Sequence, residues 1–187
     1  MAIVSVINAN NLINRINLPN NEIITYDLIQ SDSSESKYLE KYESVLNRMK
    51  QWVFNNNWKE VGNHLDDFRF LFPTIVSEYE LNNARNNSVF LIFLTQAFNL
   101  FVRSAGLNYD GLTLIVTDPA RFYSNFILGG PDYVYHEIIT NILILVKVLN
   151  LTGQYISLLH LSLDVVQSFP QHISKTISNK WISAPRI

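Results

Sequence analysis

The feature that most constrains the fold is an uncharged run over residues 88–102, which closes on Arg103. Read as an α-helix, the run carries apolar side chains on every side, and such a helix has to be enclosed by protein or by lipid. It is too short to cross a bilayer, since a membrane-spanning helix needs about 20 predominantly apolar residues. We therefore expect a helix at the centre of a protein core, with Phe98 as a core residue and no membrane among the partners.

The length and composition of the chain limit its class. A chain of 187 residues fits one domain and can bury enough apolar surface to fold without disulfides or metal ions, so we expect residues 1–187 to form a single domain. The absence of cysteine excludes a disulfide framework, a thiolate nucleophile and cysteine-ligated zinc. The first residues lack the basic and apolar regions of a secretory signal, which predicts an intracellular protein.

The charge of the chain is low. Charged residues make up 16% of it, against about a quarter in an average protein, and the net charge is −2. This balance argues against a basic nucleic-acid module of the usual kind. A weakly charged, amide-rich surface favours self-association, although an A/T-rich coding sequence would enrich Asn and Ile as well.

Helical periodicity recurs through most of the chain and predicts an all-α fold, a bundle of five to seven helices. Extended arms are expected at both ends of the chain. The N-terminal arm covers residues 1–30 and contains short strand pieces near 3–7 and 23–28. The C-terminal tail covers residues 171–187, and Trp181 is expected to dock it on the bundle. The run 112–117 is either a strand or a buried loop. The expected helices cover about residues 36–54, 58–71, 74–84, 88–103, 119–128, 133–151 and 154–168.

Short local signals mark several boundaries. Asn57 has the spacing of a capping residue for the second helix, and Asp118 followed by proline opens a later one. Asp132 is expected to cap the helix that begins near residue 133. Gly106 is expected to end the central helix in a left-handed conformation.

No catalytic motif is complete. His136-Glu137 begins like a zinc-protease motif, but Thr140 stands where the second histidine ligand is needed. His160 and Asp164 are one helical turn apart and could form a catalytic base, although a surface pair with that spacing is commoner. We therefore expect no enzymatic activity and no cofactor.

A cation site is conceivable at His64 with Asp66 and Asp67. No second histidine is near in sequence, so a solvated helix face is the preferred interpretation, and no metal is expected.

Three single arginines, Arg85, Arg103 and Arg121, each lie near the end of an apolar helix. They could point together toward one phosphate or carboxylate. Alternatively, each makes its helix end soluble or pairs with a nearby acid.

Several short motifs occur in an order that resembles the coat proteins of rod-shaped plant viruses of the tobamovirus type. The likeness covers about residues 58–104 and 132–187. It departs from the family over residues 107–130 and in the two residues that separate Arg69 from Phe72-Pro73. The matching motifs are Arg69-Phe70-Leu71-Phe72-Pro73, Ala97-Phe98, Arg103, Asp132, Asn141-Ile142-Leu143-Ile144 and Trp181-Ile182-Ser183-Ala184-Pro185.

The resemblance implies a four-helix bundle that stacks head-to-tail into a helical tube around single-stranded RNA, in a virion or in the cytoplasm of a host cell. It implies that Arg103 and Arg121 are candidate phosphate contacts and that Asp132 is a carboxylate near the RNA. The residues expected to be structural are Arg69, Phe72, Pro73, Phe98 and Trp181.

We therefore expect a non-enzymatic structural protein that self-assembles, as a helical viral coat or nucleocapsid subunit does, with further copies of itself and single-stranded RNA as partners. The alternative is a soluble helical protein-binding module of the immunity, adaptor or effector type. Such a module would bind a partner segment in a groove beside the central helix and would bind no nucleic acid.

Overall fold

The computed structural model describes residues 32–75 and 77–183, with side chains described from Lys37 onward. The N-terminal arm with its predicted strand pieces, and the last residues of the tail, lie outside this part. The α-helices are α2 (Asp32–Phe54), α3 (Trp58–Asn63), α4 (Leu65–Leu71), α5 (Glu78–Asn86), α6 (Ser88–Ser104), α7 (Pro119–Arg121), α8 (Val134–Val148), α9 (Thr152–Ser168) and α10 (Lys175–Ile182). The remaining elements are β1 (Leu107–Tyr109), β2 (Leu114–Val116), the π-helix η1 (Phe122–Ile127) and the 3-10 helix η2 (Pro131–Tyr133).

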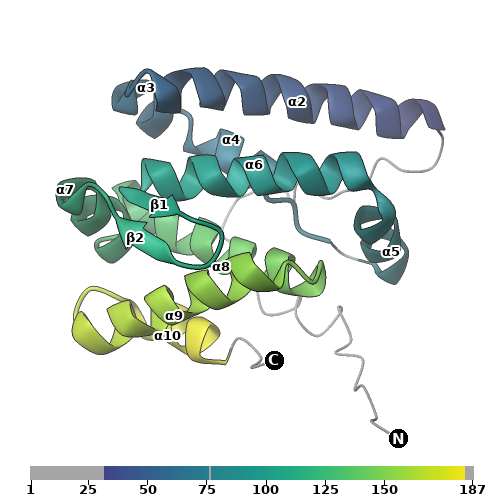
Figure 1. The fold of residues 1–187 in the computed structure, drawn as a ribbon. Coiled ribbons are helices and arrows are strands. Elements are labelled where there is room, and N and C mark those ends of the chain that lie inside the picture. Colours follow the sequence, from purple (N-terminus) through teal and green to yellow (C-terminus); the bar gives the residue numbers. More distant parts are fainter. Residues whose placement is uncertain (1–31, 76, 184–187) are drawn as a thin grey trace, which may run out of the picture.

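The helices pack in layers around one core, which confirms the all-α class. Helix α2 lies along one side of the molecule and α9 with α10 along the other, with α4, α6 and α8 between them (Figure 1). Helix α4 contacts both α6 and α8 and so links the two halves. The buried apolar side chains form a single cluster that draws on all of these helices.

The helix expected at the centre, α6, is enclosed on one face only. Phe98 is buried as predicted, but Ile92 is 57% exposed and Val89 is exposed as well. Helix α8 is the more enclosed of the two, because none of its residues is exposed. It contacts α4, α9, α10, η1 and η2, whereas the neighbours of α6 leave one of its stripes uncovered.

The described residues form nine α-helices, more than the five to seven expected, for two local reasons. The helix predicted over 58–71 breaks at His64, whose backbone (φ −127°, ψ 38°) is not helical, so it becomes α3 and α4. The tail is not extended throughout: Ser174 accepts a hydrogen bond from the Ile177 N–H and caps α10.

The tail docks through Trp181, as predicted. Its side chain is completely buried, and its indole N–H donates to the Thr140 hydroxyl at 3.0 Å. The ring also meets the His136 ring edge-on at a centroid distance of 5.6 Å. The C-terminal segment therefore completes the enclosure of α8.

The prediction that Asp132 caps this helix is wrong. Asp132 lies in η2 with φ +49° and is exposed, whereas a capping residue needs an extended backbone. Helix α8 begins only at Val134, after Tyr133, whose side chain makes no capping hydrogen bond. Gly129 precedes this turn with φ +83°, and a Cβ there would lie 2.9 Å from the His136 ring, so the chain needs glycine where α8 closes on it.

Residues 107–116 form an antiparallel hairpin, which answers the open question about the run 112–117: β2 pairs with β1, with Asn108 opposite Ile115. The Asp110 carboxylate accepts hydrogen bonds from the N–H groups of Thr113 and Leu112 and so forms the turn. The same hydrogen bonds lower the pKa of Asp110.

Candidate functional site

Two arginine–aromatic contacts lie where α2 turns into α3. The guanidinium of Arg103 is 4.9 Å from the ring centroid of Phe54, and that of Arg121 is 3.5 Å from the ring centroid of Trp58. Phe54 is the last residue of α2 and Trp58 is the first of α3. We call these four residues the arginine–aromatic corner. The structure therefore brings two of the three candidate arginines to one place.

The β1–β2 hairpin brings the two arginines to the same corner. Arg103 lies in the last turn of α6, and Arg121 lies in α7, which follows the hairpin. The hairpin returns to its start because the N–H groups of Thr117 and Asp118 both donate to the Gly106 carbonyl, at 2.9 and 3.0 Å. A Cβ at Gly106, where φ is +79°, would clash with the Asp118 carbonyl oxygen. Glycine is therefore required at this junction, for a long-range reason besides helix capping.

The two arginines differ in how far their charge is compensated. The Nε of Arg121 donates to the Asp118 carboxylate at 2.7 Å, and the Arg121 guanidinium is mostly covered. The Asp118 carboxylate also accepts the Arg121 backbone N–H, and this bond, with the ion pair, lowers the pKa of Asp118. Arg103 is exposed, and no acid among the described residues forms an ion pair with it. Arg103 therefore carries the available positive charge of the corner.

The other members of the predicted site lie elsewhere. Arg85 donates from Nε to the Val148 carbonyl at 2.9 Å, so it binds the C-terminal end of α8 and does not join the corner. Asp132 lies within the described part of the chain and forms no hydrogen bond or ion pair with Arg103 or Arg121. Of the candidate RNA contacts, only the two arginines are placed together.

The residues expected to be structural lie in the core or at its edge. Arg69 connects two helices, because one guanidinium nitrogen donates to Asp66 and the other donates to Glu137 of α8 at 2.7 Å. Phe72 and Pro73, which follow α4, are buried.

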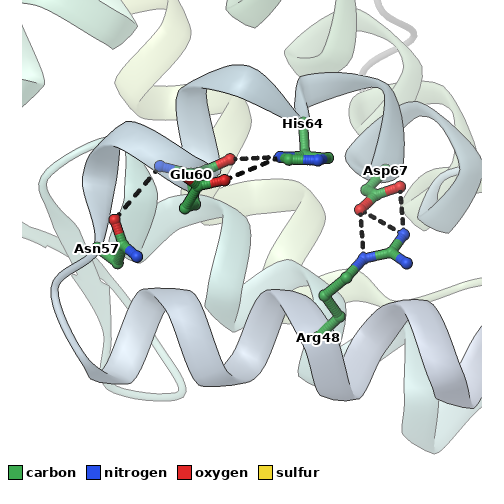
Figure 2. Close-up of polar contacts among 5 residues, drawn as sticks. All are labelled: Arg48, Asn57, Glu60, His64 and Asp67. Carbon is green, nitrogen blue, oxygen red and sulfur yellow. Dashed lines mark hydrogen bonds and ion pairs between the residues drawn. The ribbon is translucent and has the colours of Figure 1, made fainter.

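The side chains of His64 and Asp67 have different hydrogen-bond partners and do not converge on a common point (Figure 2). The His64 Nδ1 lies 2.9 Å from the Glu60 carbonyl oxygen. Asp67 accepts two hydrogen bonds from Nη2 of Arg48, at 2.7 and 2.8 Å. Asp66, which the figure does not draw, accepts a hydrogen bond from Arg69. In the described ranges, no three His, Cys, Asp or Glu side chains are grouped so that they could hold a metal ion.

The other two histidines of interest have different environments. The Nε2 of His136 lies 3.0 and 3.1 Å from the carbonyl oxygens of Phe126 and Ile127, so it donates to both. Burial lowers the pKa of His136, which favours a neutral structural side chain. His160 and Asp164 are exposed on α9, and no hydrogen bond or ion pair joins them.

Sequence reasoning missed the aromatic partners of the arginines and a depression beside them. Phe54 and Trp58 flank the Asn55-Asn56-Asn57 turn, and this spacing was the available signal. An open depression of about 490 Å³ lies on the outer face of α2, next to the corner. Its lining residues are Asn47, Lys50, Gln51, Phe54 and Asn55.

Comparison with known proteins identifies no relative: no family model, curated protein or solved structure matches the chain. The resemblance to tobamovirus coat proteins therefore rests on the short motifs alone. Within residues 32–75 and 77–183, no helix has both the length and the apolar composition for a membrane crossing.

Proposed function

We propose that this chain is a non-enzymatic structural subunit that self-assembles and holds single-stranded RNA, as a helical viral coat or nucleocapsid subunit does. The observation that carries the proposal is the arginine–aromatic corner, where Arg103 and Arg121 lie against Phe54 and Trp58. Proteins bind single strands without sequence preference by combining cations for the phosphates with aromatic rings for the bases.

The charge distribution supports this use of the corner. A chain with a net charge of −2 can hold a phosphate backbone only where it gathers its few cations. Arg103 has no acidic partner in the part of the chain that the structure describes, so it is available to a phosphate. Arg121 would have to exchange Asp118 for a phosphate, which makes its contribution the smaller of the two.

Exposed apolar residues support self-assembly. Leu112, Ile115 and Val116 of the hairpin are exposed, with Leu112 at 81%. Among the described residues, β2 pairs with β1 alone, so no described strand pairs with its other edge. Val89 and Ile92 form a second apolar surface on α6. Contact between two different surfaces of neighbouring copies is heterologous, and such contacts produce open helical assemblies.

The exposed stripe of α6 also suits the alternative, a helical module that binds a partner protein beside this helix. The two functions differ in their response to salt and RNA. The module would bind no RNA, and the structural subunit would bind it with a strong dependence on salt concentration.

The test is binding of a single-stranded RNA across a salt series by wild type and by an Arg103→Ala, Arg121→Ala double variant. Each lost phosphate contact should lower the slope of log K against log salt by about 0.7. Arg85→Ala is the matched control, because it removes an arginine from a site remote from the corner. Absence of RNA binding by the wild type under every assembly condition would exclude the RNA role. An unchanged slope in the double variant would mean that the corner is not the site.

A further inference from the structure

The depression on the outer face of α2 has a composition unlike that of the surrounding helix. Asn47 and Gln51 are four residues apart and share one stripe of α2, and Asn55 follows directly after the end of the helix. Lys50 and Phe54 extend the stripe toward the corner. The lining thus combines three amides, one ammonium group and one aromatic ring.

Phe54 is the residue that connects the depression with the arginine–aromatic corner. Its side chain is 53% exposed, which is unusual for a phenylalanine in a core-forming helix. Arg103 packs over its ring at 4.9 Å and so holds the ring from the α6 side. Phe54 also lines the depression. The exposed Phe54 ring is therefore a flat apolar surface that Arg103 holds in position.

The polar residues of the depression match the other parts of a nucleotide. Each carboxamide has both donors and acceptors, so it can bond the edge of any base. Lys50 is exposed and forms no ion pair with a described residue, and an ammonium group binds phosphate as a point charge. A base stacked on Phe54 would have amides at its edge and two cations, Lys50 and Arg103, near its phosphates.

Other occupants fit less well. A small-molecule site encloses most of its ligand, whereas this depression is open. A groove for an amphipathic helix needs a row of apolar side chains, and Phe54 is the one apolar residue in the lining. We propose that the α2 depression binds one nucleotide of a single-stranded RNA, with the base stacked on Phe54, the amides at the base edge and Lys50 at a phosphate. This inference rests on the proposed function.

The test compares full-length variants in binding to a single-stranded RNA oligomer that contains 2-aminopurine, whose fluorescence falls when the base stacks. Phe54→Leu keeps an apolar side chain but removes the aromatic face, and Phe54→Tyr keeps the face. Phe54→Leu should weaken RNA binding by about 5- to 150-fold and abolish the fluorescence change, because stacking of one base is worth about that factor. Phe54→Tyr should bind like the wild type. Tyr79→Ala is the control for loss of an exposed aromatic ring, which at Tyr79 lies on α5.

A second ligand separates stacking from charge. Polyphosphate carries the same kind of charge without bases, so Phe54→Leu should leave its binding unchanged, whereas Lys50→Ala should weaken the binding of both ligands. Equal loss of RNA and polyphosphate binding in Phe54→Leu would mean that Phe54 acts by positioning Arg103, and it would overturn the inference. RNA binding unaffected by Phe54→Leu would overturn the inference and leave the proposed function standing. A wild type that binds no RNA would overturn both.

Discussion

Helices α6 and α8 are both rich in apolar residues, yet only α8 is enclosed. Helix α6 has the longer run without a charge, but Gln96, Asn99 and Arg103 lie exposed along it. These residues recur at three- and four-residue intervals and mark one stripe. Helix α8 contains a lysine, Lys147, and still has no exposed residue. The absence of charge along a helix is therefore a weak sign that the helix is enclosed.

The two helices also differ in what covers them. The cover of α8 includes the C-terminal segment, whose Trp181 hydrogen-bonds to Thr140 inside the core. On α6 the uncovered stripe leads to Arg103 and the corner. We therefore interpret α8 as the structural centre and α6 as the helix that carries a functional surface.

The largest effect is expected from Trp181→Ala. The substitution removes a completely buried indole and its hydrogen bond to Thr140, and it opens a cavity against His136. Truncation of such a side chain costs about 3–5 kcal/mol, and we expect the upper end of this range. Urea unfolding measures it. A loss below about 1 kcal/mol would mean that the tail does not complete the core around α8.

A matched pair of substitutions tests the two faces of α6. Phe98→Ala should lower the free energy of unfolding by about 3–5 kcal/mol, because the ring is buried and a cavity remains. Ile92→Ala should change it by less than about 0.5 kcal/mol, because that side chain is on the exposed stripe. Both variants are measured at a low protein concentration at which the chain is monomeric, where similar losses would contradict the exposure of the α6 stripe.

The pH dependence of stability gives a smaller effect that is specific to α8. Burial lowers the pKa of His136, so the unfolded chain binds a proton more readily than the folded protein does. The free energy of unfolding is therefore highest, as far as His136 is concerned, above about pH 6.5, the ordinary histidine pKa. It decreases as the pH falls from there toward the lower pKa of His136 in the folded protein. Unfolding measured across this range should show the decrease, and His136→Gln should reduce it. An identical pH profile in the wild type and in His136→Gln would mean that His136 does not cause the decrease in stability.

The helix boundaries that the sequence predicted well depend on short-range hydrogen bonds. Asn57 accepts the Glu60 N–H, and Asp118 accepts the Arg121 N–H, each three residues along the chain. The positive φ of Gly106 was predicted in the same way. Such bonds join neighbouring residues, so their residue types and spacing are enough to reveal them.

The cluster at the arginine–aromatic corner, which the sequence did not predict, depends on distant parts of the chain. The contact between Arg121 and Trp58 exists because the hairpin closes on Gly106, and no local pattern encodes that closure. The prediction for Asp132 failed for a more local reason, since Gly129, Asp132 and Tyr133 all have positive φ and the chain turns tightly before α8 begins. The candidate site could therefore be predicted as residue types but not as a cluster.

The most direct test of self-assembly with RNA is sedimentation of the wild type at high protein concentration. The measurement is made with and without single-stranded RNA and at several pH values. A subunit whose α6 stripe and hairpin are assembly surfaces should form large oligomers whose size depends on pH and salt, and RNA should enlarge them. Ile92→Ser should sediment as smaller species while it unfolds like the wild type. A protein that sediments as a monomer under every condition, with or without RNA, would contradict the proposal.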